Sequence, residues 1–194
     1  MIPRDVDNLR QDIIFKADIK GHNFVFHSTW GLFSPREIDT GSLLLISQVA
    51  VKPTDCTLEI GCGYGPIGLY IAKMSPKGKV HMIDKDFVAV DFTKKNAQIN
   101  RIQNCDIYLS NMFSDVPDIK FDTIVSNLPA KVGNELLYLT LTDAKAHLKK
   151  DGKFYVVVIA GLKDYIKRNF KDVFGNYEKL KQRNNYLVAV AVKE

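Results

Sequence analysis

Short apolar runs alternate with longer amphipathic stretches through the middle of the chain. The apolar runs have the length of strands that are buried on both faces, and the amphipathic stretches have the spacing of helices that cover such a sheet. The predicted strands are residues 57–61, 79–83, 105–109, 121–125 and 153–160, and the predicted helices lie near 67–74, 87–99 and 134–149. This alternation predicts an α/β fold with a doubly wound, mainly parallel sheet.

The two ends of the chain carry strand patterns of a different kind. Residues 12–28 form two β-rich runs around Gly21, which predicts a small N-terminal β-hairpin. Residues 162–174 predict a helix, and two strand-like runs follow it, separated by the turn-prone Asn184-Asn185. This pattern predicts a terminal antiparallel hairpin. Together with the five central strands, the terminal pair makes a seven-stranded sheet.

The length and composition are those of an ordinary globular protein. With 194 residues, of which 46% are hydrophobic and 25% charged, the chain has the size of one domain. We therefore expect a single domain over 1–194, with an N-terminal hairpin extension at 1–35 and a core at 36–194. The net charge of +5 is compatible with an RNA partner and equally with a basic surface that binds nothing.

Cysteines, histidines and apolar runs argue against several classes of protein. The three cysteines are scattered, which does not suggest a disulfide framework, and the four histidines show no metal-binding spacing. The longest apolar runs, 42–51 and 154–160, are too short to span a bilayer. We expect a soluble cytoplasmic protein with no metal and no membrane contact.

The segment LEIGCGYGPIG, residues 58–68, carries the most chemical information in the chain. Its glycines at 61, 63 and 65 let the backbone approach a ligand closely as the chain passes from a strand to a helix. A dinucleotide-binding fingerprint needs a further glycine three positions after Gly63, where this chain has Pro66. A pyrophosphate ligand is therefore disfavoured.

Two acidic residues near the glycines favour a positively charged cofactor. Glu59 precedes the glycines and is expected to face a sulfonium and an α-amino group, which attract a carboxylate where a phosphate would repel it. Asp84 ends the second predicted strand, about twenty residues after the glycine loop, where a carboxylate can accept hydrogen bonds from both ribose hydroxyls.

These motifs resemble the class I S-adenosylmethionine-dependent methyltransferases. The resemblance rests on E-x-G-x-G-x-G at 59–65, then on Asp84 and Lys85, and then on Asn96 and Asn100. Residues 31–41 and 121–130 look like the small-domain methyltransferase subfamily, which includes bacterial enzymes that modify guanine in small-subunit ribosomal RNA. The resemblance covers roughly 24–192 and implies a Rossmann-like methyltransferase sheet, a catalytic core and S-adenosylmethionine as cofactor.

The resemblance also assigns further residues to the cofactor. The D-x-G at Asp39–Gly41 is similar to a subfamily motif beside the methionine end, with a plain turn and cap as the alternative. Lys85 joins the set next to Asp84. Asn111 is expected to accept from the adenine amino group, and Met112 to pack near the adenine ring, with ordinary core filling as the alternative for Met112.

In the subfamily, the fourth strand ends in Asn-Pro-Pro and an aromatic residue, a signature of methyl transfer to an exocyclic or amide nitrogen. Here the tetrapeptide is Asn127-Leu128-Pro129-Ala130. Because the lone pair of such a nitrogen is delocalised, two acceptors must hold its hydrogens and favour a tetrahedral geometry. The Asn127 side chain and the backbone carbonyl of Leu128 supply them, and Asn127 also borders the cofactor.

Ala130 lacks the aromatic ring that stacks on the target base in the subfamily. Trp30 and Phe33 are candidates to replace that ring, but we interpret them as sealing the hairpin against the sheet. Cys62 lies in the glycine loop, where the turn requires only a small side chain.

The sequence leaves three functions open. The resemblance and the charge favour methylation of an exocyclic amine, most specifically that of guanine in ribosomal RNA. A protein glutamine N-methyltransferase is the second hypothesis, since such enzymes use a closely similar turn. The third is a non-catalytic module that binds S-adenosylmethionine or RNA, because the tetrapeptide has changed. The sequence indicates neither the target nucleotide nor an oligomeric state.

Overall fold

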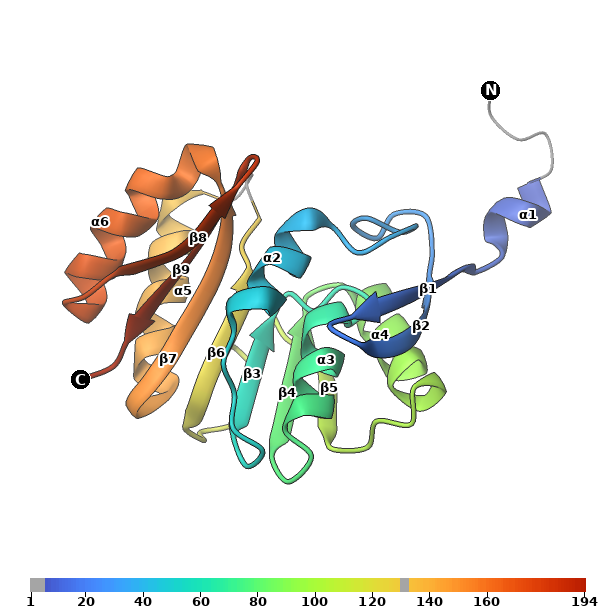
Figure 1. The fold of residues 1–194 in the computed structure, drawn as a ribbon, viewed down its shortest axis with the longest axis horizontal. Helices are drawn as coiled ribbons and strands as arrows, with labels where there is room; N and C mark the ends of the chain where they lie inside the picture. The colour runs from blue at the N-terminus through green and yellow to red at the C-terminus, as the bar shows by residue number, and fades with distance from the viewer. Residues whose placement is uncertain (1–5, 130–132) are drawn as a thin grey trace.

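A central sheet dominates the computed structural model, which describes residues 6–129 and 133–194 and has in these ranges the seven-stranded order β5-β4-β3-β6-β7-β9-β8 (Figure 1). The parallel strands are β3 (Cys56–Ile60), β4 (Lys79–Asp84), β5 (Cys105–Leu109), β6 (Phe121–Asn127) and β7 (Leu148–Ile159). β8 (Glu178–Arg183) and β9 (Tyr186–Val192) complete the sheet as an antiparallel pair. The predicted Rossmann-like fold class is confirmed.

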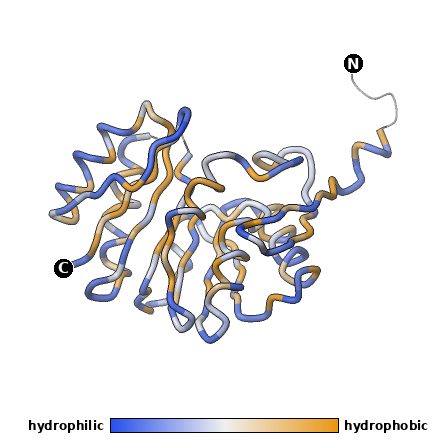
Figure 2. The backbone as a smooth tube through the Cα atoms, viewed as in Figure 1, coloured by the Kyte–Doolittle hydropathy of each residue, from blue (hydrophilic) through white to orange (hydrophobic). Residues whose placement is uncertain are grey.

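Helices cover both faces of the sheet. One face packs against α2 (Thr40–Gln48), α3 (Pro66–Met74) and α4 (Phe87–Ile99), and the other against α5 (Asn134–His147) and α6 (Lys163–Phe174). β7 contributes Tyr155 to the first core and Phe154 to the second, because alternate side chains of a strand point to opposite faces. The inner strands β7 and β9 are largely hydrophobic, whereas β8 at the edge of the sheet is hydrophilic (Figure 2).

Three stretches differ from the sequence prediction. β7 begins at Leu148, whereas the prediction placed its start at 153, because Asp151 and Gly152 look like a turn. Asp151 does take a positive φ of 62°, yet the strand continues through it, and the N–H of Asp151 donates to the carbonyl of Lys193. The short helices α1 (Val6–Arg10) and η1 (Ala160–Leu162) were not predicted.

No helix in the described part of the chain, 6–129 and 133–194, is both long enough and apolar enough to cross a membrane.

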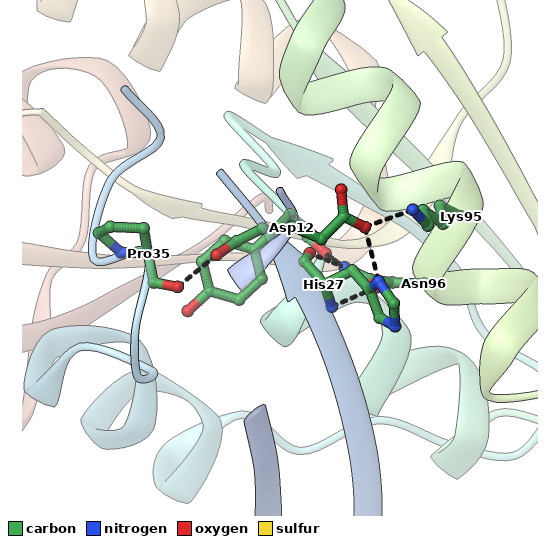
Figure 3. A network of polar contacts seen from close by, with 7 residues as sticks. Asp12, His27, Pro35, Lys95 and Asn96 are labelled. Atoms are coloured by element: carbon green, nitrogen blue, oxygen red, sulfur yellow. Dashed lines mark hydrogen bonds and ion pairs between the residues drawn. The ribbon is translucent and has the colours of Figure 1, made fainter. Parts of the chain in front are cut away.

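The predicted N-terminal hairpin forms a separate two-stranded antiparallel sheet, β1 (Ile13–Ile19) and β2 (His22–Ser28). Two asparagine amides, Asn96 in α4 and Asn100 at the C-cap of α4, attach its edge to the core. Asn96 accepts from the N–H of His27 at 2.8 Å and donates to the carbonyl of His27 at 2.9 Å (Figure 3). Asn100 pairs in the same way with Val25, at 2.9 and 2.8 Å.

The spacing of these amides explains why a helix can pair with a strand. Four residues of an α-helix rise about 6 Å, and two residues of a strand advance about 6.7 Å. Asn96 and Asn100, four residues apart, therefore match His27 and Val25, two residues apart. The two side chains act as a short substitute strand.

An ion-pair cluster supports the same contact. Asp12 accepts from His27 Nδ1 at 2.6 Å and pairs with Lys95 of α4 (Figure 3). Burial raises the pKa of Asp12, but the hydrogen bonds and charges of Lys95 and His27 outweigh burial and hold this pKa below its usual value. The hairpin is thus bonded to the core by both polar pairing and charge. The boundary between 1–35 and 36–194 stays a prediction.

Asn96→Ala is expected to lower the free energy of unfolding by ~2–4 kcal/mol, because the half-buried N–H and carbonyl of His27 and the carbonyl of Tyr64 lose this partner. Urea denaturation followed by circular dichroism measures the change. The matched control is Gln98→Ala, an exposed position on the same helix, which should change stability by less than ~0.5 kcal/mol. Equal effects of both substitutions would contradict the strand-like role of Asn96.

Candidate functional site

The carboxyl ends of the parallel strands meet several polar segments between β3 and β6, where the strand order reverses. From β3 the next strand in the chain, β4, lies on one side, and from β6 the next strand, β7, lies on the other. Open α/β sheets bind their ligands at this switch point. The glycine loop bonds here to Asp84 at the end of β4, and Asn127 at the end of β6 bonds to Asp39 before α2.

The glycine loop needs its glycines for conformation and leaves room outside them. Gly61 and Gly63 have φ values of +74° and +58°, which side chains rarely tolerate. A Cβ atom added at either position would meet no heavy atom within 4 Å. At Gly65, by contrast, an added Cβ would lie 3.0 Å from Leu69 and Thr93. The loop is thus open at its first two glycines and packed at the third.

Asp84 links the glycine loop to the start of α4. Its Oδ2 accepts from the N–H of Gly63 at 2.9 Å, and its Oδ1 accepts from the N–H of Asp86 at 3.0 Å. The side chain is half-buried, and each carboxylate oxygen can accept a second hydrogen bond. Lys85 beside it is exposed. This geometry is compatible with a carboxylate that receives two ligand hydroxyls.

Glu59 does not face the open side of the site, contrary to our expectation. The side chain is 1% exposed, and Oε2 accepts from the N–H of Gly68 in α3 at 2.8 Å, while Oε1 has no partner among the described residues. Burial raises the pKa of Glu59 well above its usual value, the Gly68 hydrogen bond lowers it, and the Asp84 charge raises it further. Glu59 instead positions α3, where Gly68 leaves no room for a side chain against Met82.

The amide of Asn127 is oriented by the start of α2. Its Nδ2 donates to Ser42 Oγ at 3.1 Å and to Asp39 Oδ2 at 3.3 Å. Asp39 Oδ2 in turn accepts from the N–H groups of Gly41 and Ser42, so Asp39 is also the N-cap of α2. With both acceptors on the nitrogen side of the amide, the half-buried side chain presents its carbonyl oxygen in the other direction.

The changed tetrapeptide is integrated into the sheet. The N–H of Leu128, which a proline would lack, donates to the carbonyl of Val157 in β7 at 3.0 Å. The Leu128 side chain is 3% exposed and belongs to the core beneath α5 and α6. Pro129 is exposed, and Ala130 lies outside the described residues. Where the related motif has a proline whose ring restricts the backbone, Leu128 is held by a backbone hydrogen bond and by its buried side chain.

Tyr64 is a structural residue of the site that the sequence reasoning missed. Its ring is buried between the glycine loop and the hairpin, and its hydroxyl donates to the carbonyls of Ser34 at 3.3 Å and Glu37 at 3.0 Å. Burial raises the pKa of Tyr64, and the charges of Asp39 and Glu37 raise it further. The hydroxyl therefore stays protonated and ties the loop before α2 to the glycine loop. An aromatic residue among small ones was the signal available in the sequence.

Trp30 and Phe33 do not seal the hairpin, so this interpretation was wrong. Trp30 is 43% exposed and Phe33 67% exposed. Leu32 and Ile38 of the same loop are buried in their place, within the core beneath α2 and α3. The Arg36 guanidinium lies 4.6 Å from the centroid of the Trp30 ring. The loop therefore offers two aromatic rings to the solvent.

The residues after β5 divide between the site and the core. The N–H of Ser110 donates to the Asp84 carbonyl at 2.9 Å, and Asn111 next to it is exposed. Met112 is half-buried and packs against the core beneath α5, where its sulfur accepts from the Thr140 hydroxyl at 3.7 Å. The structure thus shows a core contact for Met112, and its packing near an adenine ring stays a prediction.

Cys62 in the glycine loop is buried, 3.6 Å from the Thr93 hydroxyl. Burial raises the pKa of its thiol, as expected of a small packing residue rather than a nucleophile.

Comparison with known proteins relates this arrangement to methyltransferases. Residues 23–190 match the family model "Methyltransferase small domain". The chain is 34% identical over 170 residues to ribosomal RNA small subunit methyltransferase C of Haemophilus influenzae (strain PittGG), a match that covers 86% of this chain and 50% of the relative. It is 36% identical over 142 residues to the uncharacterized protein YbxB of Bacillus subtilis (strain 168), covering 72% of this chain and 71% of that protein.

Solved structures give the same relation. The T. thermophilus 16S rRNA N2 G1207 methyltransferase (RsmC), in complex with AdoMet and guanosine, superposes with a TM-score of 0.83 at 28% identity, covering 93% of this chain and 50% of that chain. A ribosomal protein L11 methylase from Lactobacillus delbrueckii subsp. bulgaricus shares the fold, with a TM-score of 0.68 at 24% identity over 86% of this chain and 84% of that chain. The chain spans about half the length of the ribosomal RNA methyltransferases that it matches.

The buried carboxyl of Glu59 is expected to make stability depend on pH. Because its pKa is raised in the folded state, its favourable contribution is complete below the unfolded-state pKa of about 4.3 and is lost as pH rises toward the folded-state pKa. Relative to Glu59→Gln, the unmodified protein should therefore lose stability progressively in urea denaturation as pH rises above ~4.3. Exposed Glu178→Gln is the control. Parallel pH profiles for the unmodified protein and Glu59→Gln would contradict the assignment.

Proposed function

The chain belongs to the methyltransferase small-domain family, and on that premise we propose that it transfers a methyl group from S-adenosylmethionine to the exocyclic amine of guanine in ribosomal RNA. The observation that carries the proposal is the orientation of Asn127. With its amide nitrogen bonded to Asp39 and Ser42, its carbonyl oxygen is left to accept from a target amine. We therefore assign Asn127, at the end of β6, as a residue that binds the substrate amine.

The residues at the switch point fit S-adenosylmethionine. The open backbone at Gly61 and Gly63 accommodates a ligand in close contact, and Asp84 has acceptor capacity for two ribose hydroxyls. Asp39, half-buried at the start of α2, has the charge that a methionine ammonium requires. Asn111 is assigned to the adenine amino group. Lys85 stays a member of the predicted set by position alone, and Gly65 and Glu59 support the site by packing.

The mechanism depends on two acceptors in this chain. S-adenosylmethionine supplies a methyl group bound to a positively charged sulfur. Asn127 Oδ1 and the Leu128 carbonyl would each accept one hydrogen of the target amine, which localises the nitrogen lone pair and directs it toward that methyl group. Pro129 follows these acceptors, and its ring fixes its own φ. Neither acceptor needs to ionise. The methylated nitrogen would carry one proton more than the neutral product, and this proton would pass to water.

The distribution of charge supports an RNA substrate over a glutamine side chain. Residues 144–194 hold 12 of the 27 Lys and Arg but only 5 of the 22 Asp and Glu. α6 and β8 are largely hydrophilic (Figure 2). Within the described ranges, their exposed lysines form no ion pairs; these are Lys163, Lys167, Lys171, Lys179 and Lys181. Such a surface favours the phosphate backbone of a polyanion.

Asp84→Ala is expected to weaken S-adenosylmethionine binding by roughly tenfold or more, because the ribose loses its acceptor and the glycine loop loses its bond to β4. Isothermal titration calorimetry on both proteins measures the change. Asp91→Ala removes the same charge from an exposed position on α4 and should leave the affinity unchanged. Failure of the unmodified protein to bind would refute the cofactor assignment.

Asn127→Ala is expected to lower kcat by ~10²–10³, an effect much larger than its effect on the affinity for S-adenosylmethionine, which Asn127 only borders. The assay follows a radioactive methyl group into ribosomal RNA and ribosomal protein from ribosomal subunits. Label that ribonuclease releases as a methylated guanosine supports the proposal, whereas label released by protease as methylated glutamine refutes it. An unaltered kcat in Asn127→Ala would show that the amine is held elsewhere.

A further inference from the structure

We infer that Trp30 and Phe33 form a stacking platform for an unpaired nucleobase of the substrate RNA, with Arg36 beside Trp30 to meet a phosphate or a base edge. The inference rests on the proposed function, since it assumes that the substrate is RNA. It adds a binding surface, distinct from the acceptors at Asn127 and Leu128, that fixes the RNA next to the site.

The exposure of these rings is a consequence of how the loop is built. Leu32 and Ile38 anchor the loop in the core with 7% and 8% of their surface exposed. Further anchors are hydrogen bonds to backbone carbonyls of the loop, from Ser28 to Pro35 and from Tyr64 to Ser34 and Glu37. A loop with this many attachments holds its outward side chains in place. Two aromatic rings on its solvent side leave apolar surface in water, which a stacking partner would cover.

The platform is attached directly to the site. The loop ends at Asp39, which bonds to Asn127, and Arg36 is only three residues earlier, so their Cα atoms lie within ~11 Å. Tyr64 attaches the middle of the loop to the glycine loop, since it stands between Gly63 and Gly65. The loop that carries the rings is therefore bonded to both segments that hold the residues assigned to the cofactor and the target amine, and RNA bound on it would extend toward them.

The chemistry of the three side chains fits a nucleobase. Every base has a π-face, and stacking on aromatic side chains is the general means of holding single-stranded RNA. Arg36 lies 4.6 Å from the Trp30 ring centroid, which braces the indole and keeps a positive charge at the platform. Ala130, at the position where the related motif has an aromatic residue, carries no ring. Trp30 and Phe33 supply the rings that this chain lacks there.

Trp30 is the single tryptophan of the chain, so its fluorescence reports on the platform without modification. Titration with a short unstructured RNA oligonucleotide that contains guanine should quench this fluorescence and protect Trp30 from acrylamide. Long-chain polyphosphate carries the charge without bases and should do neither. RNA binding without any change at Trp30, or equal quenching by polyphosphate, would overturn the inference, as would quenching by a glutamine-containing peptide in place of RNA.

Variants distinguish a loss of base stacking from a loss of folding or of the methyl-transfer step. Trp30→Ala and Phe33→Ala should each raise the KM for RNA by roughly 5- to 100-fold with little change in kcat, and Trp30→Phe should restore most of the loss. Leu139→Ala, which removes a side chain that is 55% exposed on α5, is the matched control. An unchanged KM in Trp30→Ala and Phe33→Ala would overturn the inference.

The two proposals fail in different ways. If S-adenosylmethionine binds and guanine is methylated while Trp30 is unaffected by RNA, the platform is wrong and the proposed function stands. If RNA quenches and protects Trp30 but Asn127→Ala transfers methyl groups at the unmodified rate, the platform stands and the assigned mechanism is wrong.

Discussion

The pairing of Asn96 in α4 and Asn100 at its C-cap with the backbone of β2 is the interaction on which the position of the hairpin beside the site depends. Asn96 bonds to His27 of the hairpin and also donates to the carbonyl of Tyr64 in the glycine loop at 2.8 Å. Tyr64 then holds the loop before α2, and that loop ends at Asp39. One buried side chain thus connects three segments that are distant in sequence, and the polar groups it satisfies would be costly to leave unpaired.

The site combines rigid backbone with a few directed side chains. The glycine loop takes its shape from positive φ angles, and Asp84 fixes it from the neighbouring strand. Asn127 is oriented by groups that already serve another purpose, since Asp39 and Ser42 also form the first turn of α2. A shift of α2 would therefore change both the cap of the helix and the direction of the Asn127 carbonyl. Because Asp39 and Ser42 serve both purposes, no further residues are needed to hold the Asn127 carbonyl in a fixed direction.

Much of the fold could be predicted because local patterns and tertiary structure agree. The helix predicted at 87–99 has these bounds in α4, and both hairpins occur where turn residues separate β-rich runs. The start of β7 was missed because Asp151 and Gly152 have turn propensities that sheet pairing overrides. The glycines and Asp84 could be assigned to one sheet edge from their position after strands alone.

The remaining errors concern the direction in which side chains point. Glu59 precedes the glycines in the sequence, but alternation along β3 turns it toward α3. Trp30 and Phe33 were expected to be buried because they are large and apolar, yet Leu32 and Ile38 take the buried positions of that loop. Irregular loops have no periodicity from which burial can be inferred, so only coordinates distinguish an anchor from an exposed ring.

The pairing of Asn96 and Asn100 with β2 also hinders edge-to-edge association between copies of the chain. A two-stranded hairpin has an outer edge of unpaired N–H and C=O groups, which is a template for strands of other molecules. Asn96 and Asn100 occupy these groups at Val25 and His27, and so they close this edge of β2 with a helix. At the far edge of the main sheet, β8 carries exposed Lys179, Lys181 and Arg183, whose like charges repel a second copy. Asn96 and Asn100, which support the site, and the basic residues of β8 therefore also oppose aggregation.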